Sequence, residues 1–239
     1  MKVVITQSML FPWVGTLEQM RTADILVYYD DVQFSKGSFT NRVQVKTESG
    51  VQWMTVPLRD LKLGMVIDEV KTAPGKLWRE KHLALLERSF KGAPYAEEAL
   101  LIARDVYSVD YPSIGHLARA SMFALGQYFG LLEGKRLLDV RKLCIDGSGS
   151  QRVLNIVRAL GGSVYLTGHG ARNYLDHEAF EQVDIQVNYM QYELHPYPQR
   201  WGEFTPFVTA LDLVASLGRD GLHHISSTGV TWREFLSRK

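Results

Sequence analysis

The sequence predicts an α/β protein with a mostly parallel sheet, a β-hairpin addition and a helical insertion. Short β-branched and apolar runs occur at residues 3–6, 25–29 and 164–167, and runs of this length between polar residues are typical of buried strands. After Gly15 the apolar spacing becomes helical, and a strand, a helix and a second strand give a parallel pair joined by a right-handed crossover. From residue 76 to residue 133 the pattern is mostly helical.

The length and composition are those of a globular protein with a substantial core. The chain has 239 residues, of which 46% are hydrophobic and 22% charged. We expect residues 1–75 to form an N-terminal α/β and hairpin part of the site, residues 76–133 a helical segment, and residues 134–239 a second α/β part that completes the same domain.

The charge balance bears on partners and location. Lys and Arg number 27 and Asp and Glu 26, so the formal net charge of +1 provides no global attraction to nucleic acid or anionic lipid. We therefore expect no membrane partner, and no nucleic acid apart from a charged transfer RNA on a local basic face. The sequence shows no signal-peptide pattern and no apolar run long enough to span a bilayer, which favours a cytoplasmic protein.

Cysteine and histidine patterns give no sign of a metal site. Cys144 is the single cysteine, so an internal disulfide and a cysteine-based zinc cluster are excluded. A reactive thiol needs a cationic neighbour or a helix N-terminus, and we favour a non-catalytic role for Cys144. His223 and His224 are adjacent but have no carboxylate at helical spacing. We expect neither a metal nor a cofactor.

The first strand leads into a loop with polar and aromatic residues. Gln7 follows the strand directly, and a polar side chain there requires a partner. Phe11 and Trp13 offer flat apolar faces to a ligand. The alternative is that they simply cap the core. Gly15 allows close approach to the start of the next helix, where free N–H groups favour anions.

The second strand ends at Asp30 and Asp31. Because the carboxyl ends of parallel strands meet at one edge, Gln7 and Asp30 are expected to lie together where open α/β sheets bind ligands. The loop that follows concentrates hydrogen-bond donors at Gln33, Lys36, Asn41 and Arg42.

This loop carries two cationic side chains that could bind an anion. Lys36 and Arg42 are predicted to clamp a phosphate or carboxylate. The alternative is a solvated loop in which Arg42 pairs with Asp30 or Asp31. The sequence then alternates at residues 43–46 and 51–57 around Ser49-Gly50, which predicts a β-hairpin.

The helical segment supplies packing more than chemistry. Helices are predicted around Trp78 to Leu86, over residues 96–107 and over residues 114–129. His82 lies on the apolar face of the first of these, where a hydrogen-bonded core histidine is favoured over a catalytic one.

A second α/β unit begins near residue 137. Residues 138–145 are predicted as a strand, residues 146–150 as a tight loop, and residues 151–160 as an amphipathic helix before the strand at 164–167. The Gly-Ser loop before a helix suits a phosphate, but alone it is a weak signal because it has no Walker lysine and no full dinucleotide fingerprint. Ser150 as a helix N-cap is the alternative.

The next strand ends in a second glycine-rich turn. Gly168 and Gly170 permit close backbone approach, and Arg172 and Tyr174 supply donors around the gap. His169 either tunes substrate choice or is a solvent-exposed loop histidine.

The last informative segment contains three prolines within residues 195–206. These fix the backbone, so His195, Tyr197 and Gln199 are held in place. His195 is the best general acid/base candidate, because histidine is the residue type most often used for proton transfer and because Tyr197 and Gln199 accompany it in the motif.

Taken together, these motifs resemble the WbqC-like family, whose members often lie in bacterial O-antigen and amino-sugar gene clusters. The family pattern Gln-Pro-x-Tyr-x-Pro-Trp-x-Gly corresponds to residues 7–15, QSMLFPWVG, with Ser8 and Leu10 in place of proline and tyrosine. These two departures lie in the loop that is expected to touch the substrate. Further matches are DDVQF with Lys36 and the Asn41-Arg42 pair, YLTGHGARNYL at residues 165–175, and HPYPQ followed by FTP at residues 195–206.

The resemblance implies a transferase that passes an aminoacyl group, glycine in particular, or another acyl group to the amine of an amino sugar or aminocyclitol. In that reaction His195 or Asp30, beside Asp31, takes the proton. The donor is an activated acyl species, for example on a carrier protein, and its leaving group would be clamped by Lys36, Arg42 and Arg172. Backbone N–H groups at the Gly168 turn would stabilise an oxyanion.

Two alternatives belong to other classes. A strand, a loop, a helix and a strand with an acidic end also suit an ATP- or nucleotide-binding enzyme of nucleotidyl-transfer or ligase type, although the paired histidines of that superfamily are absent. A non-catalytic sugar-nucleotide or carrier-binding protein would bind its ligand tightly without turnover.

Overall fold

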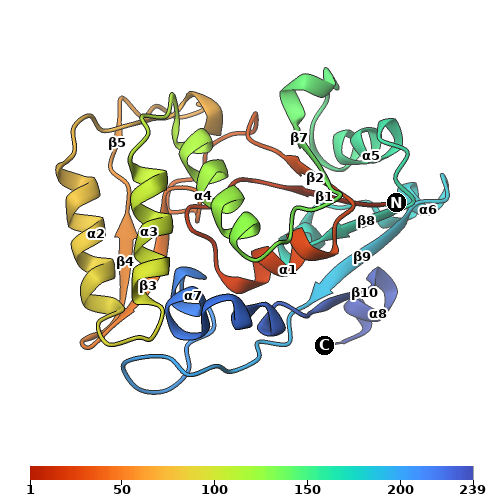
Figure 1. Cartoon of the computed structure of the whole chain (residues 1–239). Coiled ribbons are helices and arrows are strands. Elements are labelled where there is room, and N and C mark those ends of the chain that lie inside the picture. Colours follow the sequence, from red (N-terminus) through yellow and green to blue (C-terminus); the bar gives the residue numbers. More distant parts are fainter. Residues whose placement is uncertain (239) are drawn as a thin grey trace.

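The computed structural model describes residues 1–238 and contains a central six-stranded sheet (Figure 1). Its order is β10-β9-β8-β1-β2-β7. The strands are β1 (Lys2–Thr6), β2 (Ile25–Tyr28), β7 (Arg136–Asp139), β8 (Val164–Thr167), β9 (Gln186–Gln191) and β10 (Thr228–Thr231). Every neighbouring pair is parallel except β9 and β10. The predicted α/β class with a mostly parallel sheet is confirmed.

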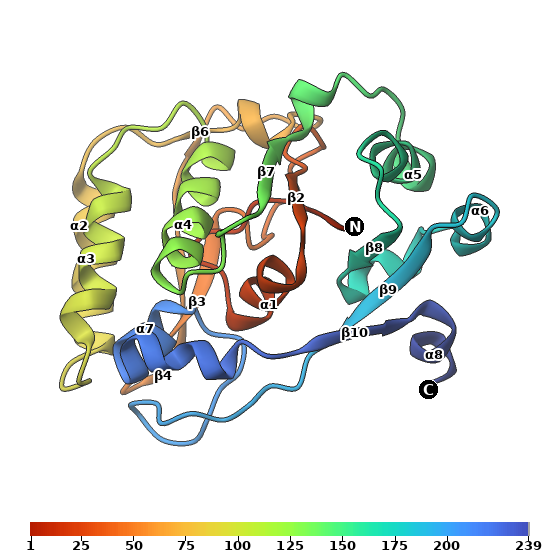
Figure 2. The same cartoon turned by 45° about the vertical axis from the view of Figure 1, so that its right-hand side comes forward.

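Helices cover both faces of this sheet (Figure 2). On one face lie α1 (Val14–Thr22), α4 (Ile114–Tyr128) and α7 (Leu211–Leu217). On the other lie α5 (Gly149–Ala159), α6 (His177–Glu181) and α8 (Trp232–Ser237). Alternation along the strands creates the two cores, because successive side chains point to opposite faces.

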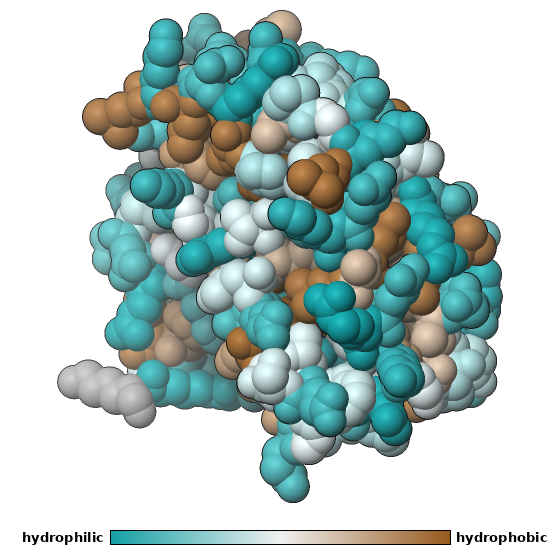
Figure 3. All heavy atoms as spheres, turned by 90° about the vertical axis from the view of Figure 1, so that its left-hand side faces the viewer, coloured by the Kyte–Doolittle hydropathy of each residue, from teal (hydrophilic) through white to brown (hydrophobic). Residues whose placement is uncertain are grey.

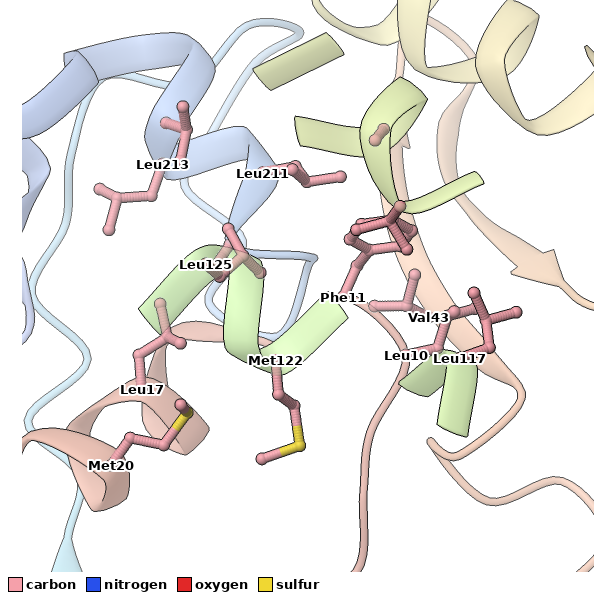
Figure 4. Close-up of a cluster of buried hydrophobic side chains, with 14 of the residues drawn as sticks. Leu10, Phe11, Leu17, Met20, Val43, Leu117, Met122, Leu125, Leu211 and Leu213 are labelled. Atoms are coloured by element: carbon pink, nitrogen blue, oxygen red, sulfur yellow. The ribbon is translucent and has the colours of Figure 1, made fainter. Parts of the chain in front are cut away.

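The first core is the larger of the two. It joins the opening loop to the helices, and Figure 4 shows Leu10 and Phe11 among side chains of α1, α4 and α7. Phe11 is fully buried, and its N–H donates to Ser121 Oγ at 2.7 Å. Phe11 therefore caps the core, which was the alternative to a ligand-binding role.

The predicted hairpin and helical insertion stand beside this core. The hairpin consists of β3 (Arg42–Thr47) and β4 (Gly50–Thr55), and a second small pair of β5 (Leu58–Arg59) and β6 (Lys71–Thr72) follows. The helices α2 (Leu77–Ser89) and α3 (Ala96–Tyr107) pack against each other, α2 also against β3 and α3 against α7. Figure 3 shows that the α2 side of the molecule is largely hydrophilic, with hydrophobic side chains in separate groups.

One predicted strand is shorter than expected. The strand predicted at residues 138–145 begins at Arg136 and ends at Asp139. The chain then forms the 3-10 turn η2 (Val140–Leu143), because the Asp139 carboxylate accepts a hydrogen bond from Arg141 N at 3.0 Å and caps the turn. Further 3-10 segments are η1 (Ile67–Glu69), η3 (His169–Asn173) and η4 (Gly218–His224). Among residues 1–238, no helix is both long and apolar enough to cross a membrane.

His82 is a buried histidine with both ring nitrogens engaged. Nε2 lies 3.1 Å from Thr55 O, and Nδ1 lies 2.8 Å from the Tyr107 hydroxyl. A carbonyl only accepts, so Nε2 carries the proton and Nδ1 accepts from Tyr107. Burial lowers the pKa of His82 to about 4 from its ordinary 6.5.

The lowered pKa of His82 makes stability depend on pH. Between pH 6.5 and pH 4 the unfolded chain binds a proton that the native state refuses, so stability is lost as the pH falls through this window. We expect this residue to account for about 3 kcal/mol of lost unfolding free energy between pH 7 and pH 4. Urea unfolding of the wild type and of His82→Gln checks this, because glutamine does not titrate. Equal pH dependence in both proteins would contradict the assignment.

Candidate functional site

A large cavity opens at the carboxyl edge of the sheet. The chain passes from β1 to β2 on one side of β1, and β8 lies on the other side, so the strand order reverses there. Doubly wound sheets bind ligands at such a switch point. The cavity has a volume of about 1030 Å³, and both Gln7 after β1 and Gly168 after β8 line it.

Seven of the residues predicted from the sequence line this cavity. They are Gln7, Trp13, Asp31, Gln33, Gly168, His169 and Tyr174. Further lining residues were not assigned to the site from the sequence and include these six: Thr16, Gln19, Tyr29, Phe39, Arg152 and Tyr192. Most of these six come from segments far apart in the chain.

An ion pair forms one wall of the cavity. Arg152 of α5 contacts Asp31 through two parallel bonds, Nη1 to Oδ1 at 2.9 Å and Nη2 to Oδ2 at 2.5 Å. Its Nε donates to Ile145 O at 2.8 Å, and its guanidinium carbon lies 5.1 Å from the centre of the Tyr29 ring. The guanidinium is thus held by Asp31, by Ile145 O and by the Tyr29 ring. The pairing of Arg152 with Asp31 was not predicted from the sequence.

A short hydrogen bond forms the opposite wall. Gln19 Nε2 of α1 donates to the Tyr192 hydroxyl at 2.5 Å. Burial raises the pKa of Tyr192 to about 12, so the hydroxyl is neutral at physiological pH. A Cβ at Gly168 would lie 3.1 Å from Gln19 Nε2 and 3.2 Å from the Tyr192 hydroxyl. Gly168 therefore packs closely against this pair, and a side chain there would crowd both polar groups.

His169 is exposed but oriented. Its Nε2 lies 2.8 Å from Met190 O, and its ring packs between Tyr192 and Phe235 at centroid distances of 5.1 and 4.8 Å. Because a carbonyl only accepts, Nε2 carries the proton and Nδ1 retains a free lone pair. A histidine held in this way has the tautomer of a general base.

Trp13 separates the cavity from the start of α1. Its ring packs on Tyr192 at 4.8 Å and on Phe207 at 5.3 Å. A Cβ at Gly15 would lie within 2.6 Å of three atoms of the Trp13 ring. Gly15 is therefore required by the indole and does not itself line the large cavity.

Asp30 lies outside the cavity and is fully buried. Its carboxylate accepts from Ser8 N at 2.8 Å, from Ser8 Oγ at 2.6 Å and from Arg119 Nη2 at 2.7 Å. Arg119 of α4 also contacts Asp139 at 2.9 Å and Asp68 at 3.3 Å. Asp30 holds the opening loop and is not positioned as a base for a substrate in the cavity.

The two departures from the family pattern are buried as well. Ser8 supplies two hydrogen bonds to Asp30 that proline has no donors to make, and Leu10 packs in the first core. Both residues are fully buried. Their side chains turn into the protein, so these two residues of the loop do not line the cavity.

The predicted anion clamp is not assembled at the cavity. Lys36 and Arg172 are exposed and do not line it. The Arg42 guanidinium lies 4.0 Å from the centre of the Trp53 ring, and Asn41 Nδ2 donates to Val56 O at 3.1 Å. Neither Asp30 nor Asp31 pairs with Arg42, since their partners are Arg119 and Arg152.

The proline-rich loop lies apart from the large cavity. His195 Nε2 pairs with Glu193 Oε2 at 2.9 Å, and its ring lines a small side chamber. Tyr197 is buried, and its hydroxyl accepts from Gln199 Nε2 at 3.0 Å. Gln199 also accepts from the buried Lys46 Nζ at 3.1 Å, so these residues fasten the loop to β3.

The fold and the cavity define a doubly wound α/β protein with a large cavity at its topological switch point, where proteins of this class bind ligands. The sequence profile of the WbqC-like protein family matches residues 7–224, and the chain belongs to this family. The chain is also similar to a Mycobacterium tuberculosis (strain ATCC 25618 / H37Rv) protein described as "Uncharacterized protein Rv1507c", with 29% identity over 223 residues that cover 92% of this chain and 95% of the relative. No solved structure matches the chain.

Removing Arg119 should destabilise the whole carboxyl edge. Arg119→Met leaves Asp30 buried without its cation, whereas Asp68 retains Arg141 at 3.3 Å. Loss of one partner from a buried ion pair costs about 3–5 kcal/mol. Chemical denaturation measures this. Arg104→Met is the matched control, because Arg104 pairs with Glu87 and Glu97 at the surface and its loss costs less than about 1 kcal/mol. Equal losses in the two variants would contradict the central role of Arg119.

Proposed function

We propose that the protein is an acyltransferase that passes an aminoacyl group, glycyl in the expected case, or another acyl group to the amine of an amino sugar or aminocyclitol. The observation that carries the proposal is His169, which lines a cavity of about 1030 Å³ and whose contact with Met190 O leaves Nδ1 with the free lone pair. This assignment replaces His195 and Asp30 as the base, because neither lines that cavity.

The proposed reaction needs one proton acceptor and no redox step. The acceptor amine attacks the acyl carbonyl of the activated donor, and His169 Nδ1 takes the proton that the new N–C bond displaces. The bond to the leaving group then breaks with its electron pair, and the same proton passes to the leaving group. The first N–H groups of η3 have no partner inside their own turn, which suits the oxyanion that forms on the carbonyl.

The walls of the cavity support binding of a polar molecule with apolar faces. Trp13, Tyr29 and Tyr192 supply aromatic surface, and Gln7 and Asp31 supply polar atoms near the sheet edge. A pocket with a few convergent polar groups among aromatic side chains is typical of small-molecule sites. Asp31 also provides an anionic neighbour for the positive charge that develops on the acceptor nitrogen during attack, although Arg152 offsets part of the negative charge of Asp31.

A nucleotide-binding enzyme is the second candidate, and one observation favours it. Gly147, Ser148 and Gly149 line the cavity at the start of α5, and the Ser148 side chain makes no capping hydrogen bond. Free N–H groups at a helix N-terminus suit a phosphate. The donor of the first proposal can use the same place if its leaving group carries a phosphate. A non-catalytic sugar-nucleotide or carrier-binding protein differs from both in showing no turnover.

A thermal-shift screen separates the first two candidates. Amino sugars, aminocyclitols, acyl-coenzyme A species, sugar nucleotides and ATP are each added far above the expected dissociation constant, where a ligand stabilises the native state by about 3 kcal/mol. We expect amino sugars or aminocyclitols to raise the melting temperature. A shift with ATP alone would contradict acyl transfer and support the nucleotide enzyme.

Replacement of His169 tests the mechanism. With an acceptor and donor from the screen, His169→Gln should lower kcat about 10²–10⁴-fold and leave acceptor binding within about threefold, as loss of a general base does. Formation of the N-acylated product is followed by mass spectrometry. His223→Gln, at an exposed histidine, is the matched control, and His195→Gln tests the base expected from the sequence. A kcat reduced by His195→Gln and not by His169→Gln would overturn the assignment.

A further inference from the structure

A side chamber adjoins the large cavity behind Trp13. Its lining includes Gly15, Glu18, His195 and His224, and its volume is about 10 Å³. That is about the smallest space that admits one water-sized group. Trp13 and Leu194 line both the chamber and the large cavity, so the two spaces are neighbours across these side chains.

Glu18 gives the chamber a buried carboxylate. The residue is 3% exposed, and its Oε1 accepts from Ser227 Oγ at 2.7 Å and from Ser227 N at 3.3 Å. Within residues 1–238, Oε2 receives no hydrogen bond and no lysine or arginine forms an ion pair with the carboxylate. Burial raises the pKa of Glu18, and the hydrogen bonds from Ser227 oppose this rise. In this part of the chain the carboxylate has no cation in direct contact, although His195 and Arg21 lie near enough to oppose the rise of its pKa.

The described polar side chains around Glu18 do not donate a hydrogen bond to its Oε2. The nearby Arg21 donates hydrogen bonds from Nη2 to Ser226 O and Ser227 O, both at 2.8 Å. His195 Nε2 contacts the Glu193 carboxylate. His224 Nδ1 is buried without a hydrogen-bond partner in the part of the chain that the structure describes. Two polar atoms of the residues that line the chamber, Glu18 Oε2 and His224 Nδ1, thus have no hydrogen-bond partner within residues 1–238. A hydrogen-bond donor is the kind of group that Glu18 Oε2 can bind.

We propose that this chamber is a subsite for the primary ammonium group of the substrate, with Glu18 as its anionic partner. The inference rests on the proposed function, in which that ammonium is the α-amine of the aminoacyl group being transferred. An ammonium is about the size of water and carries three donors, so it fits both the volume and the open acceptors. Substituents on the nitrogen or a side chain next to it do not fit, which favours glycyl over larger aminoacyl groups.

Glycinamide is a suitable test molecule because it carries the ammonium and a carbonyl but needs no turnover. Ligand-observed NMR titration of the full chain should show saturable binding of glycinamide. Acetamide, which lacks the amine, and betaine amide, whose nitrogen carries three methyl groups, should bind at least tenfold more weakly. Glu18→Gln should weaken glycinamide binding about tenfold or more, a change of about 1.4 kcal/mol. Glu178→Gln, at an exposed glutamate, is the matched control and should leave it unchanged.

Several results would overturn the subsite. They are equal binding of glycinamide to the wild type and Glu18→Gln, binding of acetamide as tight as that of glycinamide, or equal binding of betaine amide. The three ligands decide the matter on the wild type alone if Glu18→Gln does not fold. Because binding is read without turnover, a subsite that fails leaves the His169 experiment intact, and an inactive protein that still binds glycinamide through Glu18 contradicts only the transferase proposal.

Discussion

The buried ion pairs around Arg119 are the interaction on which the carboxyl edge of the sheet depends. One guanidinium from α4 holds Asp30 after β2, Asp68 in η1 and Asp139 at the end of β7. Asp30 in turn fixes the opening loop through Ser8. A Cβ at Gly115 would lie 2.3 Å from Asp68 Oδ1, so α4 can approach this carboxylate only with a glycine there. These contacts fix the opening loop, the end of β2, η1 and the end of β7 relative to one another, because a buried carboxylate left without its cation is costly.

Adjacent residues at the end of β2 have opposite tasks because side chains alternate along extended backbone. Tyr28 and Asp30 turn toward Arg119, whereas Tyr29 and Asp31 turn toward the cavity and Arg152. The acidic pair therefore contributes one carboxylate to the framework and one to the site. Each carboxylate has its own arginine, from α4 or from α5, and so the two helical layers are both anchored at the same strand end.

The cavity and the side chamber share the same aromatic partition. Trp13 lies over Gly15, packs on Tyr192 and borders both spaces. The histidines predicted from the sequence are divided by this partition: His169 lines the large cavity and His195 the chamber. Trp13 and Leu194 thus form the shared boundary between two spaces that are lined by motifs far apart in the chain.

The sequence by itself determined the strands at residues 3–6, 25–29 and 164–167, the crossover between the first two, the hairpin, the family and seven residues that line the cavity. These follow from local periodicity and from motifs at strand ends. The edge strand β10 was not predicted. Only the tertiary structure decided which polar residues meet. Arg119, Arg152 and Glu18 lie in helices whose local pattern gives no hint of their partners, and Asp30 and Asp31 look alike in sequence although one is buried and the other lines the cavity. Ion-pair choice depends on contacts between distant segments and on which face each side chain takes, and neither is encoded in local spacing.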